Sequence, residues 1–313
     1  MNSNTFKNLV LYFTLIFLFS CKSVSTVDFE KPVDTKTKPI TAQTKRIYSL
    51  ENLGVYASNQ FDGARLNGFE KLNDSTATVF VIPENEPINH SAYYAFKVWS
   101  KTPKKFYLTF KYPEGHKHRY IPKLYKNNNW HIIDSTNIIT KDTTVTIKVH
   151  LDKQPLTISA QELQTTTDVK TWYTNLIIGK EYVRFKNIGK SRLGRDLPVL
   201  DIYKGNKENK PIIVLLTRQH PPEVTGFFAF KEFLHTILDD SQLSSNFLNK
   251  FRVLAFPIIN PDGVDLGHWR HNAGGVDTNR DWSKYNQPEI RQAVTFITKQ
   301  LKKDNACLLY TSD

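Results

Sequence analysis

The chain has 313 residues, enough for two domains with a sizeable core, and its 40% hydrophobic and 12% aromatic residues are typical of a globular protein. The formal net charge is +12, but the 42 Lys and Arg residues are spread thinly, which excludes nucleic acid as a partner. Only two cysteines are present, Cys21 and Cys307, which excludes a disulfide framework and a thiol nucleophile in the folded domains.

The first residues predict a targeting segment. Lys7 precedes an apolar run, residues 9–19, that is too short to span a bilayer and fits the central region of a signal peptide. The sequence LFSC, ending at Cys21, resembles a bacterial lipobox, whose cysteine carries a lipid; an ordinary signal peptide or an uncleaved anchor is the alternative. We therefore expect a lipoprotein signal peptide over residues 1–20 and an exported protein held by Cys21 at a bacterial membrane, on the periplasmic side or the cell surface.

Residues 21–46 are polar, threonine-rich and without periodicity, which predicts a tether between the lipid and the folded body. The positive net charge fits a solvated surface near anionic headgroups, or a preference for acidic peptides.

Residues 47–163 predict an antiparallel β-sandwich, because alternating or aromatic-rich runs recur between Pro, Gly and Asn. These runs are residues 75–82, 93–100, 104–112, 130–134 and 143–151. The aromatic residues occupy alternating positions and are expected in the core, with a carbohydrate-binding platform as the alternative. His116 and His118 have no third metal partner nearby, so we expect an exposed hairpin turn there and not a metal site.

Residues 164–313 predict an α/β domain with a mixed twisted sheet. A polar linker and a short helix fall in residues 161–177; strands are expected at 182–189, 197–205, 211–217 and 251–259, and helices at 224–238 and 288–301. Two of these strands, 211–217 and 251–259, are continuous apolar runs followed by polar loops. The carboxyl ends of such strands are where open α/β sheets place their ligand sites.

His220 and Glu223 follow the first of those two strands, across a turn into a helix. An imidazole and a carboxylate at this spacing can converge on one zinc ion. On this pair alone, the alternative that Glu223 only complements the helix dipole stays open.

Four motifs occur in order after the first buried strand: HPPE (residues 220–223), NPDG (260–263), Arg270 before HNAGG, and GVDTNRDW (275–282). With them the chain resembles the M14-type zinc carboxypeptidases. YYAFKVW, RYIPKL and Trp130 resemble the β domain that precedes the catalytic domain in the cytosolic carboxypeptidase branch.

The resemblance implies one Zn²⁺ ion with His220 and Glu223 as two of its three protein ligands, and Asp277 orienting the imidazole of His220. The third ligand, a His, and the general-base Glu would lie beyond Arg280, where this chain has no His. Glu289 opens a predicted helix, and we expect it to cap the first turn and not to serve as the base.

The resemblance also implies that Arg270 polarises the scissile carbonyl and that Asn279 and Arg280 hold the terminal carboxylate of the substrate. Arginine suits this task, because its planar fork binds a carboxylate through two hydrogen bonds. No GxGxxG, GxxxxGK[ST] or GxSxG motif is present, so nucleotide binding and serine hydrolysis have no support.

The last residues, 307–313 (CLLYTSD), look like the translation of a sequencing adapter, with a real short C-terminus as the alternative. We therefore expect an incomplete, inactive fragment of a zinc metallocarboxypeptidase that removes C-terminal amino acids from peptides or proteins. The alternatives are an amidase of the same fold, acting on peptidoglycan stem peptides or acyl-amino acids, and a non-catalytic binding lipoprotein.

Overall fold

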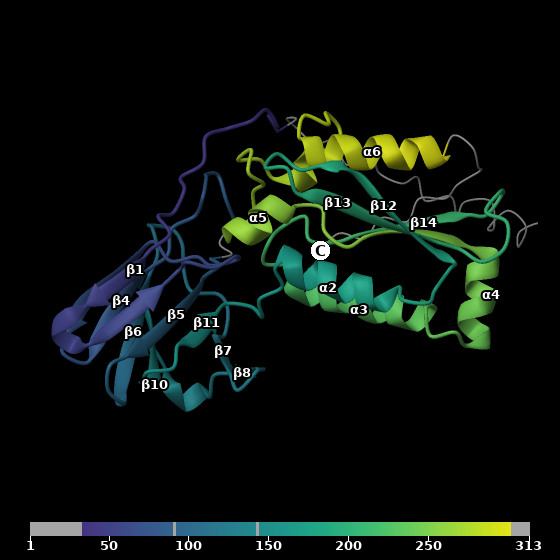
Figure 1. Ribbon diagram of the computed structural model, residues 1–313. Coiled ribbons are helices and arrows are strands. Elements are labelled where there is room, and N and C mark those ends of the chain that lie inside the picture. The colour runs from purple at the N-terminus through teal and green to yellow at the C-terminus, as the bar shows by residue number, and fades with distance from the viewer. Residues whose placement is uncertain (1–32, 90–91, 142–143, 302–313) are drawn as a thin grey trace, which may run out of the picture. The chain divides into compact units, whose positions relative to one another are not determined.

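The structure is a computed structural model that describes residues 33–89, 92–141 and 144–301 (Figure 1). The predicted signal peptide, the lipidation site Cys21 and residues 307–313 lie outside the described residues. The described residues from Thr35 onward form one compact unit. Among the described residues, no helix is both long and apolar enough to cross a membrane.

Two facing β-sheets form the predicted sandwich (Figure 1). In the described residues, the strand order of one sheet is β1 (Ile47–Leu50), β2 (Val55–Ser58), β5 (Ala95–Ser100), β11 (Leu156–Ser159), β7 (Lys123–Lys126) and β8 (Asn129–Ile132). The order of the other is β3 (Gly68–Asn73), β4 (Thr76–Phe80), β6 (Lys104–Lys111), β10 (Thr144–Leu151) and β9 (Ile138–Lys141). Two short 3-10 helices, η2 (Glu51–Leu53) and η3 (Ser135–Asn137), connect strands.

Alternation along the strands builds the sandwich core. On β6, Phe106, Leu108 and Phe110 are buried while the residues between them are partly exposed, and β10 alternates in the same way. Burying one such side chain contributes roughly 1.5–3 kcal/mol. The aromatic residues predicted for the core therefore hold the two sheets together.

One pairing differs from the predicted antiparallel pattern. β4 and β6 are parallel, with Thr76 opposite Tyr107, whereas the other pairs of the two sheets are antiparallel. The chain crosses from β4 to β5 in the facing sheet and back to β6, so β6 runs in the direction of β4. Hydrophobic alternation is the same in either direction, so it does not reveal this reversal.

The α/β region has a mixed sheet, as predicted. Its strand order in the described residues is β12 (Val183–Lys190), β13 (Asp196–Ile202), β15 (Arg252–Phe256) and β14 (Ile212–Leu216). β14 and β15 are parallel, and the other neighbours are antiparallel. The helices are α2 (Thr166–Leu176), α3 (Val224–Ile237), α4 (Gln242–Lys250), α5 (Pro261–Leu266), the 3-10 helix η4 (Thr278–Arg280) and α6 (Pro288–Leu301).

Helices cover both faces of this sheet (Figure 1). Alternate residues of β15 point to opposite sides: Val253 and Ala255 join the core under α2 and α3, and Leu254 and Phe256 join the core under α6. Burial on both faces explains why β14 and β15 read as continuous apolar runs.

Candidate metal centre and active site

His220 and Glu223 lie in the turn that connects β14 to α3. Arg218 has a left-handed backbone (φ 56°), and Glu223 occupies the N-cap position of α3. The backbone N–H of Asn260 donates to the carbonyl of Arg218 (3.1 Å), which joins this turn to the one that follows β15. The two strand ends therefore meet at one edge of the sheet, as the sequence predicts.

The imidazole of His220 lies between two carboxylates. Its Nε2 is 2.8 Å from Asp277 Oδ1, its Nδ1 makes a short contact with Glu223 Oε1, and its backbone N–H donates to Glu223 Oε2 (3.2 Å). If Nε2 carries the proton that Asp277 accepts, Nδ1 presents a lone pair toward a carboxylate oxygen. The lone pairs of Nδ1 and of the carboxylate oxygen repel each other unless a cation lies between them, either a proton or a metal ion.

The charges of this cluster support each other. Burial favours the neutral imidazole, but the bonds from Asp277 and Glu223 raise the pKa of His220 above its usual value. Burial alone would raise the pKa of Asp277, yet its bonds with His220 and Arg270 hold that pKa well below the usual range. Asp277 is therefore an anion that contacts both the imidazole of His220 and the guanidinium of Arg270.

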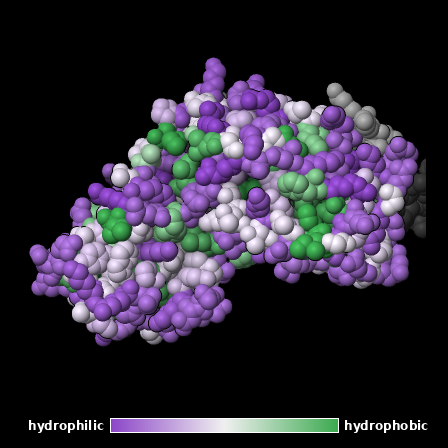
Figure 2. Space-filling view, in the orientation of Figure 1, coloured by the Kyte–Doolittle hydropathy of each residue, from purple (hydrophilic) through white to green (hydrophobic). Residues whose placement is uncertain are grey.

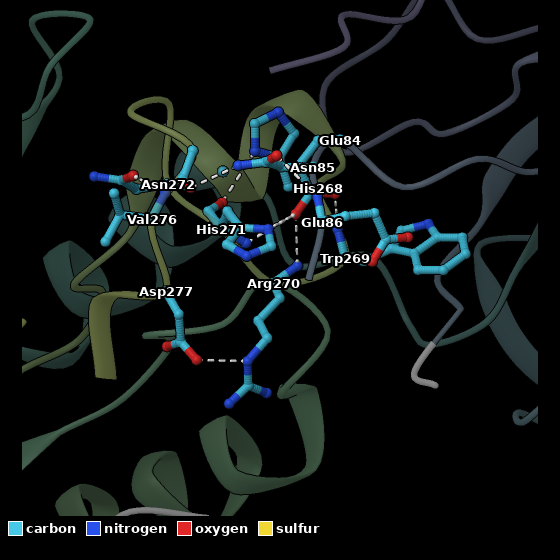
Figure 3. Close-up of polar contacts among 12 residues, drawn as sticks. Glu84, Asn85, Glu86, His268, Trp269, Arg270, His271, Asn272, Val276 and Asp277 are labelled. Atoms are coloured by element: carbon cyan, nitrogen blue, oxygen red, sulfur yellow. Dashed lines mark hydrogen bonds and ion pairs between the residues drawn. The ribbon is translucent and has the colours of Figure 1, made fainter. Parts of the chain in front are cut away.

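Asp277 connects the remaining predicted site residues. Arg270 Nε donates to Asp277 Oδ2 (2.6 Å), a contact visible in Figure 3, and the backbone N–H of Asn279 donates to Asp277 Oδ1 (2.9 Å). Asp277 is the N-cap of η4, which carries both Asn279 and the exposed Arg280. The structure thus gathers His220, Glu223, Asp277 and Arg270 directly, and it places Asn279 and Arg280 in the adjoining turn.

Gln219 was not predicted from the sequence, although it ties the motifs together. Its carbonyl accepts from Asn260 Nδ2 (3.2 Å) and Thr278 Oγ1 (3.0 Å), and its Oε1 accepts from Trp282 Nε1 (2.7 Å). Its position next to His220 was the only available signal. The Asn260 side chain also caps α5, whose Asn-Pro-Asp start is typical of a helix N-terminus.

Glu289 lies in the first turn of α6, as predicted, but it is buried. Its carboxylate accepts from the backbone N–H of Arg192 (3.1 Å) and from Asn272 Nδ2 (3.0 Å). Burial raises its pKa. Glu289 thereby braces the loop that contains Asn272 and does not contact the His220 and Glu223 pair in the described contacts.

His116 and His118 are partly buried, so the prediction of an exposed hairpin turn is wrong in this respect. His118 Nδ1 lies 2.8 Å from the Tyr112 hydroxyl, and His116 Nε2 lies 3.0 Å from Glu86 Oε1. Both imidazoles pack against aromatic rings.

The donor set suits zinc in part. Within residues 33–301, apart from the two short gaps, no group of three or more His, Cys, Asp and Glu side chains is placed to hold a metal ion. His220 and Glu223 supply one nitrogen and one oxygen, a combination that zinc accepts, and a proton held between Nε2 and Asp277 would leave the lone pair of Nδ1 available to the ion. The described residues therefore offer two ligands and one orienting carboxylate.

Glu223 also borders an apolar hollow. A cavity of about 260 Å³ between β14 and α3 is lined by Glu223 together with Leu215, Ala229, Phe230 and Phe233. In the view of Figure 2, hydrophobic side chains form separate patches on a largely hydrophilic face. Glu223 thus lies at the margin of this hollow.

Known proteins share sequence and fold with parts of this chain. A family described as "Zinc carboxypeptidase" matches residues 172–305. An uncharacterised protein of Zymomonas mobilis is 33% identical over 107 residues, which is 34% of this chain and 27% of that protein. Cytosolic carboxypeptidase 2 of Xenopus tropicalis is 31% identical over 106 residues, 32% of this chain and 11% of that protein. The aligned part thus covers only 27% and 11% of these relatives' length.

Among solved structures, a metallo-carboxypeptidase from Pseudomonas aeruginosa has a TM-score of 0.65 at 18% identity, covering 80% of this chain and 68% of that one. At this identity the similarity establishes the fold. It spans the sandwich as well as the α/β region, because 80% of the chain extends well beyond residues 172–305.

Proposed function

We propose that the protein removes C-terminal amino acids from peptides or proteins by zinc-dependent hydrolysis, and the match of residues 172–305 to a family described as "Zinc carboxypeptidase" supports this. The observation that carries the proposal is the connected set Glu223, His220, Asp277 and Arg270. In it, His220, which also contacts Glu223, and the guanidinium of Arg270 share the carboxylate of Asp277.

Each residue of this set has a defined task. Asp277 keeps the proton on His220 Nε2, so that Nδ1 and the Glu223 carboxylate face the metal position. Zinc, when bound there with further ligands, supplies an activated water whose pKa is roughly 7. Arg270 brings positive charge beside the pair and stabilises the oxyanion that develops on the scissile carbonyl.

Asn279 and Arg280 provide substrate recognition. They share the turn that Asp277 caps, and the exposed guanidinium of Arg280 can bind a terminal carboxylate through two hydrogen bonds. An enzyme with this device requires a free C-terminus.

The test compares two peptides that differ only in a free or an amidated C-terminus, using the product of the full reading frame loaded with zinc. We expect release of amino acids from the free peptide alone, a loss of about 10²–10³-fold in kcat for Arg270→Ala, and a KM about 10-fold or more higher for Arg280→Ala. Equal cleavage of both peptides would contradict the proposal. Hydrolysis of acyl-amino acids but not of peptides would favour the amidase.

We propose that residues 1–313 by themselves hold zinc weakly and do not turn over peptides, because the described residues offer two ligands and stable zinc sites use three or four. Competition of the purified chain with a chelating dye measures this directly. Tight, stoichiometric zinc binding that His220→Ala abolishes would overturn this part. Reading the gene past the codon for Ala306 without adapter ligation would show whether a further His and Glu follow.

We further propose that the protein is exported and anchored through a lipid on Cys21, with peptide C-termini near a bacterial membrane as its substrates. The lipobox sequence supports this. In fractionated cells, Cys21→Ser is expected to move the protein from membranes to the soluble fraction, while Ser25→Ala leaves it in place. Unchanged membrane retention of Cys21→Ser would argue against the anchor.

A further inference from the structure

We propose that Glu84, in the loop after β4 of the sandwich, is a positioning residue for Arg270, so that the β-sandwich helps to build the active site. The inference rests on the proposed carboxypeptidase function for its kinetic consequence. Its structural basis stands on contacts between two segments far apart in the sequence.

Glu84 binds the backbone on which Arg270 is carried (Figure 3). Its carboxylate accepts hydrogen bonds from the consecutive backbone N–H groups of Trp269 (2.7 Å), Arg270 (3.0 Å) and His271 (2.8 Å). In addition, His271 Nδ1 lies 3.0 Å from Glu84 Oε1. One side chain of the sandwich thus fixes three successive peptide units, and Glu84 is completely buried where it does so.

The side chain next to Arg270 is part of the sandwich core. Trp269 is 1% exposed and packs within the cluster formed by the sandwich strands. Its ring meets the edges of His116 (5.2 Å between centroids) and Tyr112 (6.5 Å). The backbone before Arg270 therefore moves only if the sandwich core is disturbed.

The far end of the same loop is tied as well. Asn85, the neighbour of Glu84, donates from Nδ2 to the carbonyl of Gly275 (2.8 Å), and the backbone N–H of Lys38 donates to the carbonyl of Gly274 (2.8 Å). Gly275 has φ 67°, and a Cβ there would lie 2.6 Å from the carbonyl oxygen of Lys38. The close approach leaves little freedom between Arg270 and Asp277.

The chemistry at this point requires a carboxylate. Arg65, His268 and His271 are all buried around Glu84, and Arg65 Nη2 lies 3.9 Å from its Oε2. Burial alone would raise the pKa of Glu84, but His268, His271 and Arg65 hold that pKa well below its usual value. A glutamine would turn an NH₂ group toward backbone donors and lose the charge that the surrounding donors need.

Arg270 is consequently held at two points. Glu84 fixes its backbone and Asp277 fixes its Nε, so the direction of the guanidinium is set by one residue of the sandwich and one of the α/β region. A displacement of about 1 Å in a catalytic group can cost about 10²-fold in rate. The sandwich is therefore expected to influence kcat without touching the substrate.

The first test needs no enzymatic activity. Glu84→Gln is compared with Glu70→Gln, an exposed glutamate of β3 that serves as the matched control. Hydrogen exchange followed by mass spectrometry is expected to show at least about 10-fold faster exchange for the amides of residues 267–277 in Glu84→Gln, with the α3 amides unchanged. Unchanged exchange in the loop, or equal acceleration everywhere, would overturn the proposal. Asn85→Ala, which removes the second tie, is expected to give a smaller acceleration in the same segment.

The second test uses kinetics of the zinc-loaded full reading-frame product. Glu84→Gln is expected to lower kcat about 10- to 100-fold with KM within about two-fold, and to have no further effect in an Arg270→Ala background. Independent, multiplicative losses would show that Glu84 acts only on general stability, and would overturn the proposal.

The two tests separate this inference from the proposed function. If the wild-type protein hydrolyses no peptide, the proposed function fails, while the exchange of the loop amides still decides whether Glu84 holds the Arg270 backbone. If the wild type is active and Glu84→Gln retains wild-type kcat, only the positioning role fails.

Discussion

Asp277 is the residue through which the candidate site is connected. It accepts from His220, from Arg270 and from the backbone of Asn279, using both carboxylate oxygens. Asp277→Asn removes the charge of this side chain and keeps its size, so it tests whether Asp277 orients the imidazole of His220.

We expect Asp277→Asn to lower zinc affinity about 10- to 100-fold, because the amide no longer favours the tautomer of His220 that exposes Nδ1. Competition with a chelating dye measures the change. Asp239→Asn, at an exposed position outside the site, is the control and should leave affinity unaltered. An Asp277→Asn protein that binds zinc as tightly as wild type would show that Asp277 does not orient His220.

Sequence motifs predicted most residues of the candidate site, but they did not predict the residues that hold these in place. His220, Glu223, Asp277 and Arg270 belong to short motifs, and the structure places them side by side; their catalytic roles remain predictions. Glu84 belongs to no motif and contacts a loop 185 residues away, a distance over which sequence periodicity carries no information.

At the scale of elements, a buried ion pair joins β13 to β15. Arg252 donates to both oxygens of Asp201 (2.7 and 2.8 Å), and Lys186 of β12 donates to Asp201 Oδ2 (2.9 Å). Arg252 and Asp201 are each 1% exposed. Loss of one partner leaves the other charge buried without compensation, which costs about 3–5 kcal/mol.

Asp201→Asn is therefore expected to lower the free energy of unfolding by about 3–5 kcal/mol at pH 7. Burial raises the pKa of Asp201, but the bonds from Arg252 and Lys186 outweigh burial and hold this pKa below the unfolded value of about 3.9. The stabilisation is thus fully present above about pH 4 and is lost as the pH falls through the lower folded pKa.

Denaturant unfolding between pH 7 and pH 3 tests this dependence. The difference between wild type and Asp201→Asn should shrink below about pH 4, while Asp62→Asn, an exposed control, should show no comparable difference at any pH. A difference that stays constant down to pH 3 would contradict the assignment.

Long or strongly patterned elements were predictable, and short ones were not. Continuous apolar runs located β14 and β15, and alternation located β6 and β10. The strands that escaped prediction are mostly four residues long, such as β1 and β7, and too short to show a period. Helix α4 was also missed, although the Ser241 cap that starts it is a recognisable signal.

At the scale of the whole molecule, the sandwich and the α/β region share a core residue. Trp269 belongs to the α/β sequence yet is buried among sandwich side chains, and residues from Thr35 onward form one compact unit. The two regions predicted as separate domains should accordingly unfold together.

Calorimetry of the chain is expected to give one transition whose calorimetric and van't Hoff enthalpies agree. Trp269→Ala removes the shared core residue, and we expect a loss of about 3–5 kcal/mol together with a split or broadened transition. Phe233→Ala, a partly exposed position on α3, serves as the control. Two well-separated transitions in the wild-type protein would show that the contact does not couple the regions.

The distance along the chain between Glu84 and Trp269 also bears on the order of assembly. His220 and Glu223 are three residues apart and meet as soon as the turn before α3 forms, whereas the contact of Glu84 with Trp269 closes a loop of 185 residues. Contacts of such separation form late, because the entropy of closing the loop is lost before they stabilise the chain. During refolding, the contact between His220 and Glu223 should therefore appear first and the placement of Arg270 last.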